Sequence, residues 1–149
     1  MDYKKLQSGD IITYPMSFCD GIVDMPLVVE YCDSPTHIVT HNHVSAKHLM
    51  EVCGANIELA DDLQIDLPFL HANSWEEEYR AYCLDPFRCI SWMRIAEESY
   101  YVYEFRIDNK LWHHHYEGQI RTVRQLQHIL RDCGMEDIAN NLQLPENNN

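Results

Sequence analysis

Basic residues are scarce in this sequence. It holds 11 Lys and Arg against 24 Asp and Glu, which leaves a formal net charge of -13. A surface so negative repels phosphate backbones, so direct binding of DNA or RNA is not expected. The imbalance lies in the first half, because positions 10–79 hold thirteen acids and a single base, Lys47. A protein partner with a basic surface would be attracted to this half and would meet it faster.

Long apolar runs are also lacking. No stretch approaches the roughly 18 apolar residues that span a bilayer, and the N-terminal residues contain no apolar segment of the kind that a secretory signal needs. We therefore expect a cytoplasmic protein that does not contact membranes. Five Gly, six Pro and 46% hydrophobic residues allow a folded core and argue against disorder.

The patterns of common catalytic sites are missing. The sequence has no P-loop, no G-x-G-x-x-G and no G-x-S-x-G elbow. Its six cysteines form no C-x-x-C pair, and we expect them as core residues in a reducing compartment rather than as disulfides or zinc ligands. These absences favour binding over catalysis and predict no cofactor, although they leave enzymatic activity open.

The first third of the sequence predicts a small sheet. β-branched residues alternate with turn-forming Asp, Gly, Ser and Pro, which is typical of short strands in a curled, barrel-like arrangement. Ser45 is placed to cap a helical turn that ends at Gly54, and residues 57–78 predict a loop with a short helix. The strands are expected at 11–14, 26–32 and 37–43.

The C-terminal half predicts an aromatic meander followed by a helix. A two-residue turn at Asp108 and Asn109 would pair Phe105 with Trp112 and gather aromatic side chains on one buried face. Thr122 and Gln125 form a capping box, and Gly134 marks the end of an amphipathic helix expected to pack on this hairpin. The strands are expected near 79–84, 87–95, 100–107 and 110–116.

Together these elements predict an α+β fold of small antiparallel sheets with a packed C-terminal helix. A chain of 149 residues suits one compact domain. A division into two lobes, over about 1–56 and 57–149, is the alternative that the pattern of elements allows.

Histidines provide the candidate metal ligands. His41 and His43 lie two residues apart on an expected strand, as do His113 and His115, and the expected hairpin register sets Glu104 across from His113. Two imidazoles and a carboxylate are a set that Fe(II) or Zn(II) accepts. The competing interpretation is that both pairs are polar faces of half-buried strands, since no H-E-x-x-H or other third ligand stands at a recognisable spacing.

Two runs of acids are the candidate partner-binding residues. Adjacent acids on a polar stretch are also typical of solvated surface, so the runs by themselves do not decide between the two roles. They are Asp61, Asp62, Glu76, Glu77 and Glu78.

The end of the chain resembles a recurrent ending in short uncharacterised proteins of Bacteroidetes phages and mobile elements. The resemblance lies in residues 100–107 (YYVYEFRI) and 121–134 (RTVRQLQHILRDCG), which are similar to an aromatic hairpin and a "VHQLQNL" helix. Arg124 stands where those proteins usually carry His. The resemblance implies an origin and a fold, and it implies no activity.

Three hypotheses about function follow from the sequence. The leading one is a non-enzymatic, acidic protein-binding module encoded by a phage or mobile element, in one version a blocker of a host nucleic-acid-binding effector. The second is a metal-binding protein or metal-dependent enzyme that uses the histidines above. The third is a structural or assembly protein of a virion.

Overall fold

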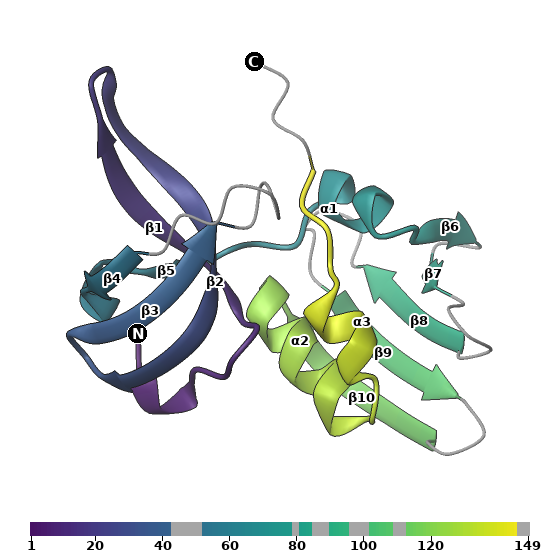
Figure 1. Ribbon diagram of the computed structural model, residues 1–149. Helices are drawn as coiled ribbons and strands as arrows, with labels where there is room; N and C mark the ends of the chain where they lie inside the picture. Colours follow the sequence, from purple (N-terminus) through teal and green to yellow (C-terminus); the bar gives the residue numbers. More distant parts are fainter. Residues whose placement is uncertain (43–51, 79–80, 85–89, 96–101, 109–112, 146–149) are drawn as a thin grey trace. The chain divides into compact units, whose positions relative to one another are not determined.

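The strands of the chain form two antiparallel sheets, one in each half of the sequence (Figure 1). The computed structural model describes residues 1–42, 52–78, 81–84, 90–95, 102–108 and 113–145. The chain divides into two compact units, Met1–Leu63 and Gln64–Asn149, and each unit contains one sheet. That the two units fold as one domain stays a prediction. The overall class is α+β, as expected.

The first sheet has the strand order β4-β3-β2-β1-β5. Its strands are β1 (Ile11–Phe18), β2 (Gly21–Ser34), β3 (His37–Asn42), β4 (Val52–Ala55) and β5 (Asp61–Asp62). The three strands expected in this region are present, and the first two are longer than predicted. Gly54 lies inside β4, so the prediction that it ends a helix is wrong, and Ser45 lies outside the described residues.

The curled form expected for both sheets is wrong for the sheet that packs against the C-terminal helices, which is neither closed nor strongly curled. For the first sheet a barrel-like curl stays a prediction, and the sheet is open among its described residues. Closure would require its outermost strands, β4 and β5, to pair with each other, and no such pairing exists among the described residues. Both strands are short, with four and two residues, so neither offers the length of edge that a closed barrel needs.

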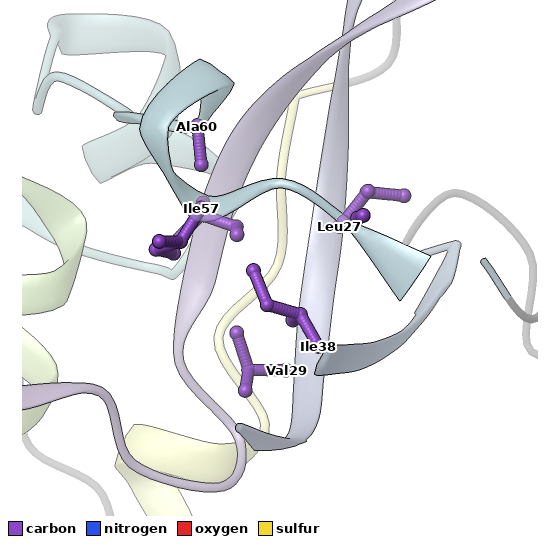
Figure 2. Close-up of a cluster of buried hydrophobic side chains, with 7 residues drawn as sticks. Leu27, Val29, Ile38, Ile57 and Ala60 are labelled. Carbon is purple, nitrogen blue, oxygen red and sulfur yellow. The ribbon is translucent and has the colours of Figure 1, made fainter. Parts of the chain in front are cut away.

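The core of the first unit lies on one face of its sheet. Ile12 of β1 and Leu27 of β2 are register partners and are almost fully buried, so they share this face. The 3-10 helix η2 (Ile57–Leu59) adds Ile57, which is 1% exposed. Figure 2 shows part of this cluster, whose buried members are Ile12, Leu27, Val29, Ile38, Ala55, Ile57 and Ala60.

The second sheet is a meander in which each strand pairs with the next along the chain. Its strands are β6 (Glu76–Glu78), β7 (Ala81–Leu84), β8 (Ile90–Ile95), β9 (Val102–Asp108) and β10 (His113–Ile120). The last four lie where the sequence predicted strands. This sheet packs against the C-terminal helices, as expected (Figure 1).

The predicted register of the β9–β10 hairpin is wrong. Asp108 pairs with His113 and Phe105 with Tyr116, whereas a turn at Asp108 and Asn109 would have paired Phe105 with Trp112. Two-residue hairpin turns usually need φ > 0 at both central positions and therefore favour Asn-Gly or Asp-Gly. The Asp-Asn sequence has no glycine, and the partners of residues 104–108 in β10 lie four residues farther along the chain than predicted.

The helix α2 (Val123–Asp132) begins and ends as the sequence predicted. The Thr122 hydroxyl accepts a hydrogen bond from the Gln125 N–H (3.1 Å), and the Gln125 side-chain oxygen accepts one from the Thr122 N–H (3.2 Å). Gly134 has φ of +76°, and the Met135 N–H donates to the Leu130 carbonyl (2.8 Å), which is the Schellman ending.

Two shorter helices complete the second unit. In α1 (Leu67–Ala72), the Asp66 carboxylate accepts a hydrogen bond from the Phe69 N–H (2.9 Å) and caps the helix. The helix α3 (Glu136–Asn140) is joined to α2 by the buried Gln127, whose side-chain amide donates to the Ala139 carbonyl (3.0 Å).

Candidate functional site

The far end of the β1–β2 hairpin carries exposed apolar side chains. Phe18 is 48% exposed, Ile22 is 73% exposed and Val23 is 51% exposed. We call residues 16–24 the hairpin tip. Large apolar side chains that gather on a surface typically mark a site of interaction with a protein or membrane, so the tip is the candidate functional site.

The tip continues the core-facing side of the sheet beyond the core. Paired residues of an antiparallel sheet share a face and alternate along each strand. The buried pair Ile12 and Leu27 is followed on the same face by Tyr14 with Met25, which pack against the core only in part. The Tyr14 hydroxyl accepts a hydrogen bond from the Asn56 N–H (3.1 Å) and so anchors the base of the hairpin. Beyond that pair, the apolar residues Met16, Phe18 and Val23 continue on the same face but do not belong to the buried core cluster.

The hairpin tip lies beyond the neighbouring strands of the sheet (Figure 1). β3 pairs with β2 from Leu27 onward, and β5 pairs with β1 at Ile12 and Thr13. Within the described part of the chain, no strand pairs with the outer edges of the tip. The two strands are joined by a two-residue turn, Cys19–Asp20, and Gly21 follows it with φ of +128°, a conformation that favours glycine.

Acidic residues accompany the apolar side chains of the tip. Asp20 lies in the turn and Asp24 follows Val23, and both are exposed. Residues 11–34, which make up the whole hairpin, contain four acids and no Lys, Arg or His. The tip is therefore an apolar surface in a negative environment.

Two acids of the first half have local structural roles. Asp10 is fully buried and accepts a hydrogen bond from the Gln7 N–H (2.9 Å). Asp66 caps α1. The charge count of the sequence therefore overstates the number of carboxylates that are available to a partner.

Two further acids pair with histidines of β3. The register of β2 against β3 shifts at Glu30 and again at Asp33, so each acid is an extra residue in a β-bulge. Glu30 pairs with His41, and the Asp33 carboxylate lies 2.6 Å from Nδ1 of His37. Both histidines lie on the strand that the sequence predicted over 37–43, but each engages its own carboxylate.

The structure does not assemble the candidate metal sites within its described residues. His41 pairs with Glu30, and His43 lies outside the described residues. The prediction that Glu104 lies across from His113 in the hairpin is wrong. Glu104 is the register partner of Glu117, whereas His113 and His115 are opposite Asp108 and Arg106. No group of three His, Cys, Asp or Glu suited to a metal is found in the part of the chain that the structure describes.

The predicted partner-binding acids lie on outermost strands. Asp61 and Asp62 form β5, at the edge of the first sheet, and Glu76–Glu78 form β6, at the edge of the second among the described strands. Charged residues on such strands oppose pairing with the edge of another sheet. Edge protection is thus a second explanation for these acids, and their role in partner binding stays a prediction.

Burial makes the thiols of Cys32 and Cys133 poor nucleophiles, because it raises the pKa of each. Burial raises the pKa of the Cys133 thiol, and the neighbouring Asp132 carboxylate raises it further. Burial also raises the pKa of Cys32. Both thiols therefore stay protonated at neutral pH. Cys133 is buried as predicted, whereas Cys19 is exposed in the hairpin turn, so a core position is wrong for Cys19.

Comparisons of the chain with protein-family models, with curated proteins and with solved structures found no match. The resemblance to short proteins of Bacteroidetes phages and mobile elements therefore stays a prediction. Among the described residues, no helix has both the length and the apolar character needed to cross a membrane.

The residues of the hairpin tip were missed by the sequence reasoning. The predicted strand covered only residues 11–14, and the next one began at Pro26, so the hairpin through Gly21 was not predicted. The signal that could have found the tip is the continued apolar alternation through Met16 and Phe18, followed by Cys-Asp-Gly as a turn.

Proposed function

We propose that this chain is a non-enzymatic, acidic protein-binding module whose partner presents a basic surface. The observation that carries the proposal is the exposed apolar tip of the β1–β2 hairpin, which lies in an acid-rich unit. An interface of this kind combines an apolar centre, which supplies most of the affinity, with charges around it that speed encounter and select the partner.

The charge of the first unit supports this proposal. Residues 1–63 contain ten acids and three bases, two of which, Lys4 and Lys5, lie in the 3-10 helix η1 (Tyr3–Lys5). The local roles of Asp10, Glu30 and Asp33 reduce the acids that can face a partner, but Asp20, Asp24, Glu58 and Asp61 are exposed. The unit therefore retains a negative surface.

A phage or mobile-element origin stays part of the proposal, and with it the version in which the chain covers the basic surface of a host nucleic-acid-binding effector. The negative charge supports this version because the same basic surface that attracts phosphates would attract the chain. Competition between the chain and a duplex oligonucleotide for the purified effector tests it. Simultaneous binding of both would contradict it.

The association rate with the partner is expected to fall steeply as salt increases. Charges that steer an encounter are screened over about 10 Å at 0.1 M salt, so the rate should drop at least about tenfold between low and moderate ionic strength. A partner recovered from host lysate at low salt, then purified, allows the rate to be measured by stopped flow. A rate that does not change with salt, or recovery of no partner at low salt, would contradict the proposed function.

A further inference from the structure

We infer that the hairpin tip docks as a wedge into an apolar groove on a different protein, and that Lys or Arg side chains border this groove. The inference rests on the proposed function and names the surface and the partner chemistry that would serve it. It is carried by the placement of Phe18, Ile22 and Val23 at the end of a hairpin where no described strand pairs with the outer edges of residues 16–24.

The tip presents apolar side chains on both of its faces. Met16 and Val23 are register partners and share one face, on which Phe18 also lies. Ile22 pairs with Ser17 and lies on the opposite face. A flat partner surface would cover one face and leave the other in water, whereas a groove covers both. The site on the partner that receives the tip is therefore a groove.

Prolines at the base of the tip, one on each strand, disfavour pairing of the hairpin edges with a strand of the partner. Pro15 on β1 and Pro26 at the base of the tip on β2 have no N–H to donate, so an added strand would lack a hydrogen bond at each position. Proline on an edge strand is a common protection against strand addition. The inference therefore assigns the affinity to the side chains of the tip.

Charge selects the kind of partner. Asp20 and Asp24 flank the apolar side chains, and the hairpin has no base to neutralise them. A second copy of the chain would bring these carboxylates against the same carboxylates, and an anionic membrane would also repel them. A groove bordered by Lys or Arg pairs with both acids and leaves the apolar side chains to fill its floor.

Photo-crosslinking followed by titration tests the inference. The chain is produced with p-benzoylphenylalanine in place of Phe18 or, as a control, of Leu59, which is 56% exposed and outside the hairpin. After irradiation in lysate, mass spectrometry identifies the protein and the peptide attached to each position. The expected result is a protein linked through position 18, at a peptide with apolar residues next to Lys or Arg, and no such link from position 59.

The purified partner then distinguishes the outcomes. F18S/I22S/V23T should raise its Kd at least tenfold, the isosteric D20N/D24N should raise it at low salt, and L59S should leave it unchanged. A partner bound equally by F18S/I22S/V23T would overturn the hairpin inference and leave the proposed function standing. Position 18 linked to another copy of the chain, or binding to vesicles of phosphatidylcholine and phosphatidylglycerol, would also overturn it. Absence of any partner would overturn both.

Discussion

Replacing Leu27 by alanine is expected to lower the free energy of unfolding by about 3 kcal/mol. Leu27 is 1% exposed and belongs to the buried cluster of the first unit, where it is paired across the sheet with Ile12. The substitution removes buried apolar atoms and leaves a cavity that the surrounding β-strands can only partly close. Urea denaturation followed by circular dichroism measures the change.

Ile22 in the same strand provides the matched control. It is 73% exposed, so I22A should change the free energy of unfolding by no more than about 0.5 kcal/mol. The difference between the two substitutions separates residues that hold the fold from residues that are free to contact a partner. Equal losses for L27A and I22A would show that the tip is packed in the folded protein, which would contradict its assignment as a docking surface.

Replacing Gln127 by leucine is expected to lower the free energy of unfolding by about 2 kcal/mol. Gln127 is fully buried in α2, and its amide donates to the Ala139 carbonyl in α3. Leucine nearly keeps the volume but cannot donate, so a buried carbonyl loses this hydrogen bond. Urea denaturation again gives the change.

Arg131 makes an exposed hydrogen bond between the same two helices and serves as the comparison with the buried bond of Gln127. Its guanidinium donates to the Asn140 side-chain oxygen (3.2 Å) in an exposed position. R131Q should cost no more than about 0.5 kcal/mol because water replaces an exposed hydrogen bond readily. If R131Q proves as costly as Q127L, burial of the amide is not what makes the α2–α3 contact stabilising.

The parts of the fold that local signals specify could be predicted from the sequence. The capping box at Thr122 and the glycine ending at Gly134 fixed the bounds of α2, because both depend on residues that are near in sequence. The register of β9 against β10 could not be predicted in the same way. It depends on which of several turns lets the aromatic strands pair best, and the position of Phe105 opposite Tyr116 is a property of both strands together.

The candidate site could be predicted from the sequence even less than the fold. Composition showed that the first half is acidic, but it did not show that Asp10 is buried or that Glu30 and Asp33 occupy bulges beside histidines. Burial and pairing arise from the tertiary structure. The exposure of Phe18 and Ile22 could not be predicted either, because an apolar strand residue is buried in most sheets, whereas no described strand pairs with the outer edges of residues 16–24.

Amide hydrogen exchange of the wild-type chain, with and without the purified partner, tests most directly whether the hairpin tip is the surface that binds. Slower exchange is expected at residues 16–24 in the complex, with little change at Leu59 and in β5. Unchanged exchange across residues 16–24, together with protection elsewhere in the chain, would contradict binding through the hairpin tip.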